Sequence, residues 1–332
     1  MSWWANNSSL IASNGSLTLF ARSGTEVSIF VIIYILLSAT VVVGNILVVA
    51  SYATNAKLRT GISMFFVSLA VSDLCVGLIS IPWWIYQLLC SPTIKNCTSK
   101  DTNLIILNRI FDIFSALASI MNLVAISIER RIVVSNLKKI SKRGRNKKVN
   151  LIMISVAWFL AMGISIYNGI YSSLAYSRIR TLVLFLCGFV VPLVIMVFIY
   201  IDIYRLVRKT QEKISRHISL HQRRVRVNTF EERKTAQTVI IITALFVLAW
   251  TPFFVVSVLY PYSPSSLPSG EKLKSLIDFI KWMHYSNSAV NPFVYAFRNE
   301  EIRKAMLRVI PKCFYYLCCK AGSAQERRLR RY

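Results

Sequence analysis

The sequence lacks the residue patterns on which enzymes depend. Its apolar segments contain no paired nucleophile and base, no glycine-rich loop that could hold a phosphate, and no closed set of metal ligands. Catalysis by side chains requires such groups at a shared site. We therefore predict that the protein is not an enzyme and needs no cofactor.

Acidic residues are also scarce. The 14 Asp and Glu residues against 40 Lys and Arg give a formal net charge of +26. Such an excess can indicate nucleic-acid binding, but here the basic residues gather in Lys138–Lys148, Arg208–Arg226 and Arg303–Arg331, and the alternate connections nearly lack them. This asymmetry marks the cytoplasmic side of a membrane protein. We predict an extracellular N-terminus, a cytoplasmic C-terminus, no nucleic-acid partner, and attraction to anionic membrane lipids.

Long apolar runs dominate the rest of the chain, which is 55% hydrophobic. Seven runs are long enough to cross a bilayer as helices, at about 27–52, 62–89, 103–134, 149–170, 180–206, 235–262 and 272–297. We predict an all-α membrane protein, with one seven-helix bundle over residues 27–297. A transporter or channel is the less favoured alternative, because it would show internal repeats and paired broken spans.

The two flanking regions carry candidate modification sites. No cleavable signal peptide is evident; sequons in residues 1–26 and before the third span predict glycosylation of Asn6, Asn7, Asn14 and Asn96. Cys90 and Cys97 lie on the same side and could form a local disulfide or remain free. In the cytoplasmic region 298–332, separate apolar and basic faces predict an amphipathic eighth helix on the inner leaflet. The cysteines that follow it are palmitoylation candidates, namely Cys313, Cys318 and Cys319.

Polar residues inside the apolar spans are costly in lipid and therefore indicate function. Asp112 and Arg130 are 18 residues apart (130 − 112), which is about five helical turns. They share one face with Ser119 between them, and that face must contact protein or water.

Several short motifs occur in order along the spans. They are Gly44-Asn45, Ser68–Leu74, Glu129-Arg130-Arg131, Trp158, Pro192, Tyr200, Phe246-x-x-x-Trp250-Thr251-Pro252 and Asn291-Pro292-Phe293-Val294-Tyr295. Together they resemble the rhodopsin-like (class A) G-protein-coupled receptors, from about residue 27 to 319. Asp112 and the stretch Trp282–Ser288 further resemble the biogenic-amine branch.

The resemblance implies a ligand site around Asp112. Its carboxylate would form a charge-assisted hydrogen bond to a ligand ammonium, with Tyr285 bonded to the carboxylate. Aromatic walls that suit a cation would come from Trp250, Phe253, Phe254, Trp282 and Tyr285. The alternative is a buried acid that is paired internally among ordinary packed aromatics.

Lys281 complicates this site because it shares the stripe of Tyr285 on the seventh span. It could pair with Asp278 three residues earlier, extend to the membrane surface, or pair with Asp112. We favour Asp278, because Lys281 is expected near the membrane surface. A pair with Asp112 would instead favour an anionic or zwitterionic ligand.

The resemblance also implies a polar cluster and an activation switch. The mid-membrane cluster is Asp73, Ser119, Asn287, Ser288 and Asn291; it matches a family site for an allosteric sodium ion, and a water-filled network is the alternative. At the cytoplasmic end, Arg130 of Glu129-Arg130 would pair with Glu232 until the bundle opens. The other switch residues are Tyr200, Tyr295, Pro192, Ile120 and Phe246.

The sequence departs from the family pattern at the outer loops and after Arg130. Ile105 stands near the position of the usual cysteine, residues 171–180 contain no cysteine, and Arg131 replaces a tyrosine. We predict a plasma-membrane receptor for an extracellular small molecule, of the biogenic-amine type, that signals through a heterotrimeric G protein. The alternative within the family is a peptide, nucleoside-like or other non-amine ligand.

Overall fold

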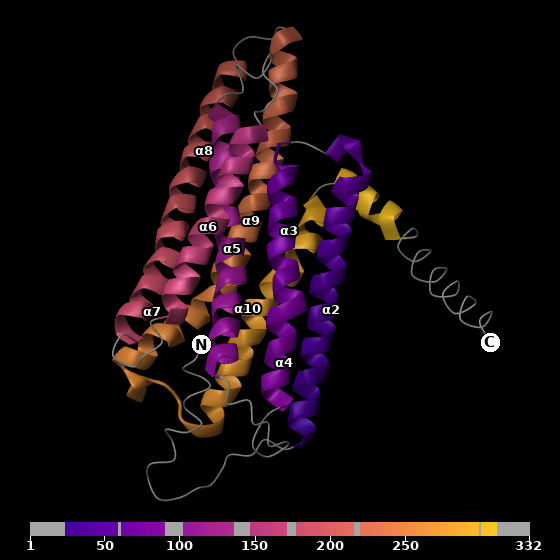
Figure 1. The fold of residues 1–332 in the computed structure, drawn as a ribbon. Helices are drawn as coiled ribbons and strands as arrows, with labels where there is room; N and C mark the ends of the chain where they lie inside the picture. Colours follow the sequence, from indigo (N-terminus) through magenta and orange to yellow (C-terminus); the bar gives the residue numbers. More distant parts are fainter. Residues whose placement is uncertain are drawn as a thin grey trace, which may run out of the picture.

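The computed structural model describes residues 24–58, 61–89, 102–135, 147–170, 177–215, 220–298 and 300–310. The candidate glycosylation sites, the palmitoylation cysteines, and Cys90 and Cys97 lie outside these residues and stay predictions. Those residues fold as seven helical spans packed side by side (Figure 1), which confirms the predicted all-α bundle.

The spans have the following bounds. The first span is α2 (Gly24–Thr54), and the second comprises α3 (Ser63–Cys75), η3 (Val76–Ser80) and α4 (Ile81–Leu89). The third span is α5 (Thr102–Ser135), and the fourth is α6 (Lys147–Ile170). The fifth comprises α7 (Ser177–Phe185), η5 (Leu186–Val190) and α8 (Val191–Ser215), the sixth is α9 (Leu220–Tyr262), and the seventh is α10 (Gly270–Arg298). Short 3₁₀ turns lie at η2 (Ala56–Leu58) and η6 (Pro264–Ser266).

The fifth and sixth spans are longer than hydropathy predicts. The sequence predicted that the fifth span ends at 206 and that the sixth begins at 235. In the structure α8 continues to Ser215 and α9 begins at Leu220. Figure 1 shows both helices projecting beyond the others at one end of the bundle. Hydropathy marks only the part of a helix that lies in lipid, and polar residues such as Lys, Arg and Gln continue a helix well in water.

The seventh span is the least apolar. Among the described residues, six helical segments are long and apolar enough to cross a membrane by composition, and α10 is not one of them. Its first half carries Lys272, Lys274, Asp278 and Lys281. Packing of α10 against α2 and α9 gives some of these groups protein surroundings, since Asp278 and Lys281 are both buried.

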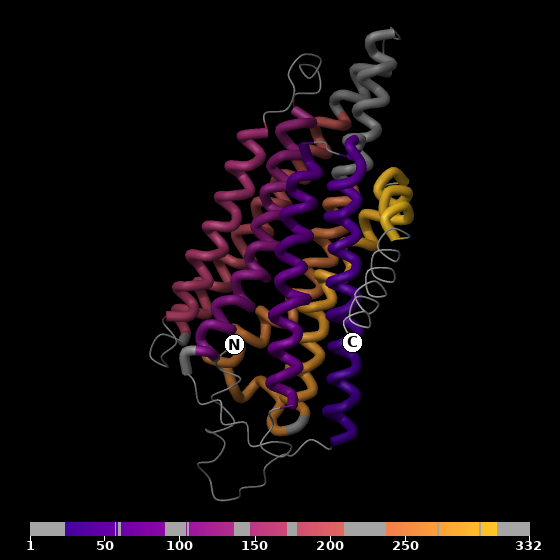
Figure 2. Tube along the Cα trace, turned by 45° about the vertical axis from the view of Figure 1, so that its right-hand side comes forward, coloured from indigo at the N-terminus to yellow at the C-terminus, as the bar shows by residue number. Residues whose placement is uncertain are grey.

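Helix α5 is the central element of the bundle. It contacts α3, α6, α8 and α9. In its most apolar 18-residue stretch 72% is buried inside the protein, against 17% for α2 and 22% for α6. The course of α5 among these helices can be followed in the tube view (Figure 2). A residue that α5 points inward is therefore held by several other helices.

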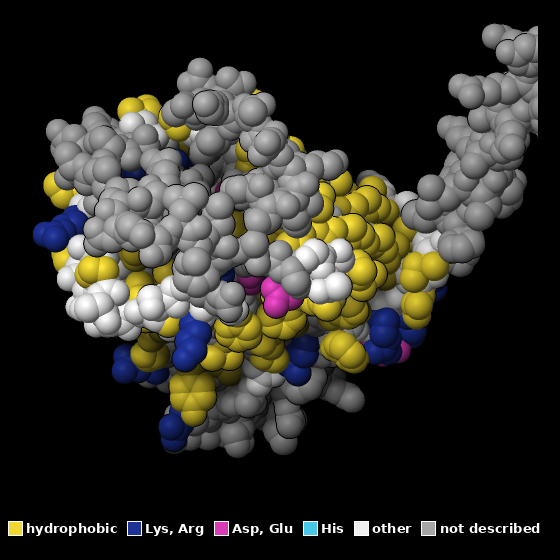
Figure 3. Space-filling view, turned by 90° about the horizontal axis from the view of Figure 1, so that it is seen from below, with side chains coloured by type: hydrophobic (Ala, Val, Ile, Leu, Met, Phe, Trp, Pro, Cys, Tyr) yellow, Lys and Arg dark blue, Asp and Glu magenta, His cyan; other side chains and the backbone are white. Residues whose placement is uncertain are grey.

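The outer surfaces of the other spans are apolar. Phe159 of α6, Phe198 of α8 and Leu248 of α9 are all more than half exposed. In the view from below, hydrophobic side chains cover much of the described surface (Figure 3). Large continuous apolar surfaces of this kind belong in contact with lipid.

Residues 300–310 form a further helix after α10. Ile302, Ala305 and Val309 are buried on one face, while the other face carries the ion pair of Lys304 with Glu300 at 2.9 Å. This segment turns away from the bundle axis (yellow in Figure 1). The predicted amphipathic pattern is thus present in the helix.

Close packing of α5 on α6 yields a first prediction. A Cβ on Gly169 would lie 2.1 Å from Cγ1 of Ile110, whereas a Cβ on Gly163 would meet nothing within 4 Å. We expect Gly169→Val to destabilise the protein by about 1–3 kcal/mol through overpacking, and Gly163→Val to have little effect. Thermal unfolding of the detergent-solubilised protein tests this; equal melting temperatures for the two variants would contradict the packing described.

Candidate ligand-binding site

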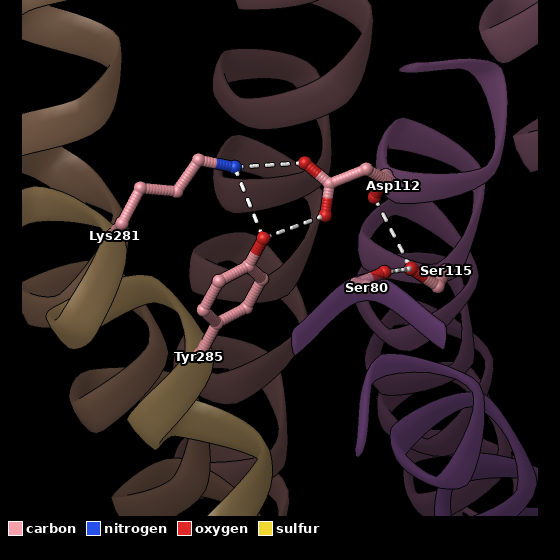
Figure 4. Close-up of polar contacts among 5 residues, drawn as sticks. All are labelled: Ser80, Asp112, Ser115, Lys281 and Tyr285. Atoms are coloured by element: carbon pink, nitrogen blue, oxygen red, sulfur yellow. Dashed lines mark hydrogen bonds and ion pairs between the residues drawn. The ribbon is translucent and has the colours of Figure 1, made fainter. Parts of the chain in front are cut away.

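Asp112 lies inside the bundle near the extracellular end predicted for α5, and it is 4% exposed. Its Oδ2 accepts a hydrogen bond from Nζ of Lys281 at 2.8 Å, and its Oδ1 accepts one from the Tyr285 hydroxyl at 3.3 Å. Lys281 also donates to the Tyr285 oxygen at 3.2 Å. Figure 4 shows this triangle between α5 and α10. The predicted contact of Tyr285 with Asp112 is therefore present in the structure.

The structure pairs Lys281 with Asp112, which was the alternative to the Asp278 pair that we favoured. We expected its ammonium to pair with Asp278 near the membrane surface, but it forms an ion pair with Asp112 and is 3% exposed. The four-carbon stem of lysine is long enough to carry the charge inward from α10. Asp278 is buried as well, so burial does not distinguish the two carboxylates. The ammonium lies on Asp112 because Lys281 extends from α10 toward α5, where the Asp112 carboxylate is within hydrogen-bond distance.

Two aromatic residues beside this ion pair were not predicted from the sequence. The ammonium of Lys281 lies 5.1 Å from the ring centre of Trp84, and the Tyr34 ring packs edge-on against both Trp84 and Tyr285. Tyr34 lies on α2 and Trp84 on α4. Both are aromatic residues in apolar spans, so no pattern distinguished them from ordinary lipid-facing side chains.

The serine pair below Asp112 was also missed. Oγ of Ser115 donates to the Asp112 backbone carbonyl at 3.1 Å and lies 3.3 Å from Oγ of Ser80 (Figure 4). Ser80 belongs to η3, a π-helical turn, and such turns often occur at functional sites. This wide turn lies directly against α5.

A cluster of aromatic rings lies next to the ion pair. Trp250, Phe253 and Phe254 of α9 contact one another, with centroid separations of 5.1–5.8 Å. His284 lies 4.0 Å from Trp250 and 4.9 Å from Tyr285, so it joins this cluster to the Asp112 site. Within the described part of the chain, Trp250 Nε1 and His284 Nδ1 are buried without a hydrogen-bond partner. Both can therefore bond to a ligand.

Trp282 does not belong to this cluster. It is 43% exposed and stacks on Phe279 on the outer side of α10. Residues next to each other in a helix point about 100° apart, so the inward position of Lys281 directs Trp282 toward the outside. Of the predicted aromatic walls, the structure brings together Trp250, Phe253, Phe254 and Tyr285.

Most of the predicted polar cluster forms around Asp73, which is fully buried. Asn291 Nδ2 donates to its Oδ2 at 2.8 Å, Ser119 Oγ to its Oδ1 at 3.5 Å, and Ser288 also bonds to this carboxylate. Asn45 joins from α2 by donating to the Ser288 carbonyl at 3.2 Å, and Asn287 is buried on α10. Carboxylate and hydroxyl oxygens are ligands that suit a small hard cation.

The cytoplasmic end of α5 holds a buried ion pair. Arg130 Nε donates to Glu129 Oε2 at 2.7 Å, and both side chains are 3% exposed. The side chain of Glu232, the predicted partner across the bundle, lies outside the described residues, so that contact stays a prediction.

The other predicted switch residues link the helices. The Tyr200 hydroxyl bridges Ser127 of α5 at 2.7 Å and Thr243 of α9 at 3.2 Å. Pro192, Ile120 and Phe246 are buried in the core, and Tyr295 packs on Phe66 at 4.6 Å. Phe246 in turn lies 5.8 Å from Trp250, so rings connect the ligand site to the interior.

Comparison with known proteins decides the family. Residues 44–295 match the model of the 7 transmembrane receptor (rhodopsin family). The chain belongs to this family. The receptor shares 30% identity with the D(1A) dopamine receptor of Didelphis virginiana, over 88% of its own length and 74% of the relative's. It shares 28% with the histamine H2 receptor of Cavia porcellus, over 94% and 86%. Members of this family are receptors, so the expectation that the chain is not an enzyme holds.

Across the described ranges, no group of three or more His, Cys, Asp or Glu side chains could hold a metal ion. The contacts around Asp112 are an ion pair, a hydroxyl and aromatic rings, which suit recognition of an organic ligand by charge and shape.

A double-mutant cycle tests the central ion pair. We expect Lys281→Met alone to destabilise the receptor by about 3–5 kcal/mol, because it leaves the Asp112 carboxylate buried without its counterion. The double variant Asp112→Asn/Lys281→Met should recover most of this loss.

The matched control is the pair of Arg131 with Asp202, which is 2.7 Å long but 51% and 39% exposed. Its coupling energy should stay below about 1 kcal/mol. Both coupling energies are measured by thermal unfolding. Equal values for the two pairs would contradict the buried position of the Asp112 pair.

Proposed function

We propose that the receptor binds an extracellular small molecule whose ammonium takes the place of the Lys281 ammonium on Asp112. The observation that carries the proposal is the triangle of Asp112, Lys281 and Tyr285, because it shows a carboxylate whose surroundings already accommodate an ammonium. Trp84 and Tyr285 supply ring faces on which a cation is stabilised. The relatives named for dopamine and histamine support a ligand of the biogenic-amine type.

Internal pairing sets the condition for binding. The ligand must compete with Lys281. Its apparent affinity is therefore its intrinsic affinity multiplied by the fraction of receptors in which Asp112 is free. A ligand whose ammonium lies on Asp112 and whose other end reaches Trp250 and His284 gains interactions that Lys281 cannot make. Leu184, Phe185, Cys187 and Gly188 offer no hydroxyl pair, which favours a ligand without a catechol.

We infer signalling through a heterotrimeric G protein. An agonist that binds the open bundle better than the closed one shifts the population toward the open state. The contacts that must rearrange include the Tyr200 bridge between α5 and α9 and the proposed pair of Arg130 with Glu232. Pro252 lies within α9 and weakens the helix where such a motion can occur. The Asp73 cluster is the proposed sodium site and would favour one of the two states.

We further propose a plasma-membrane location with the N-terminus outside. The basic connections then face anionic lipid headgroups, and nucleic acid is not a partner.

The ligand assignment is tested by G-protein activation in cells against a panel of small amines. We expect Asp112→Asn to raise the required amine concentration about 10- to 100-fold, the value of a charge-assisted hydrogen bond. Lys281→Met should lower it by at least about tenfold, since internal competition ends. Phe159→Leu, on the outer face of α6, is the control. Unchanged responses of the Asp112 variant, at equal surface expression, would rule out the proposed contact.

Orientation has its own test. An epitope at the N-terminus should be labelled on intact cells, whereas an epitope at the C-terminus should require permeabilised cells. Labelling of the C-terminal epitope on intact cells would contradict the proposed orientation.

A further inference from the structure

Arg109 is a buried cation that the proposed amine contact does not use. It lies one turn before Asp112 on α5, toward the end where a ligand would enter, and it is 5% exposed. In the described part of the chain its Nε and Nη1 are buried without a hydrogen-bond partner. Unpaired N–H groups of a buried guanidinium lose hydration without compensation, so a missing anion would stabilise this residue.

Arg180 of α7 is a second buried cation close to Arg109. The charges of the two guanidinium groups act on each other, and Arg180 is 8% exposed. Helices α5 and α7–α8 run in the same direction, and they touch where a Cβ on Gly188 would lie 2.8 Å from Leu117. Arg109 and Arg180 each lie eight residues before that contact (117 − 109 and 188 − 180), so they occupy the same level of the bundle.

The charge balance of this half of the bundle points the same way. Its described, buried charged groups are the cations Arg109, Arg180 and Lys281 and the anions Asp112 and Asp278. A ligand that brings only an ammonium would bring a further positive charge to this half without an anion. A ligand with an ammonium and a carboxylate adds no net charge, and its carboxylate can accept paired hydrogen bonds from a guanidinium.

We propose that Arg109 and Arg180 form a carboxylate subsite one turn outside Asp112, and that the ligand is a zwitterion of the amino-acid type. Its ammonium binds Asp112 and its carboxylate binds Arg109 and Arg180. This inference rests on the proposed function for the ammonium contact and adds an acidic group to the ligand.

The experiment compares matched compounds on the full-length receptor, with G-protein activation as the readout. One set is L-tyrosine, tyramine and 3-(4-hydroxyphenyl)propionate; the second is L-histidine, histamine and imidazolepropionate; the third is L-tryptophan, tryptamine and indolepropionate. Within each set the compounds carry both charged groups, the ammonium alone, or the carboxylate alone. In at least one set, we expect the amino acid to act at a concentration about tenfold or more below that of its amine.

Variants then assign the preference to the subsite. Arg109→Gln should remove the advantage of the amino acid while the response to the amine remains, and Arg109→Lys should retain part of it. Arg178→Gln is the matched control, because Arg178 lies at the same end but is exposed and bonds to the Pro261 carbonyl at 3.1 Å. That variant loses the same charge and should keep the full preference.

Each outcome separates the two proposals. If an amine acts as well as its amino acid on the native receptor, the carboxylate subsite is overturned and the ammonium contact stands. If a carboxylate-only compound acts as well as the amino acid, the subsite stands and the ammonium contact is overturned. A surface-expressed receptor that responds to none of the compounds would overturn both. Equal loss of preference in the Arg178 and Arg109 variants would overturn the assignment to Arg109.

Discussion

The ion pair of Asp112 with Lys281 is the interaction on which the half of the bundle that contains the candidate ligand site depends. Both side chains are buried, and a buried charge is tolerated only with a counterion and further hydrogen bonds. Tyr285 supplies the hydrogen bond, and Trp84 supplies a ring face for the ammonium. The pair connects the central helix α5 to α10, so a ligand that separates it acts on the contact between two spans.

Contacts continue from this pair toward the cytoplasmic end. His284 joins Tyr285 to Trp250, Trp250 packs near Phe246, and farther along α9 the Thr243 hydroxyl bonds to Tyr200. A chain of packed side chains carries a signal only when it has two arrangements that the ligand favours differently. We propose the Tyr200 bridge as such an element, since its hydroxyl bonds to both α5 and α9 and would release one of them if the helices separated.

The sequence predicted the seven spans, the inward face of α5, and the contact of Asp112 with Tyr285. These depend on local signals: hydropathy, helical spacing and motifs whose resemblance is specific. The partner of Lys281 could not be predicted in the same way, because spacing along α10 favoured Asp278 while the choice depends on the distance between α5 and α10. Trp84, Tyr34 and the proximity of Arg109 to Arg180 also depend on packing between spans. The extended ends of α8 and α9 were missed because hydropathy reports lipid contact and not helix length.

The most direct test of the account is the position of Lys281 in experimental structures of the receptor with and without an activating ligand. We predict that the ligand-free receptor keeps Nζ of Lys281 within hydrogen-bond distance of the Asp112 carboxylate. In the complex, the ligand ammonium should occupy that position and Nζ should have moved away. A bound agonist that leaves the pair of Lys281 and Asp112 intact would contradict the account.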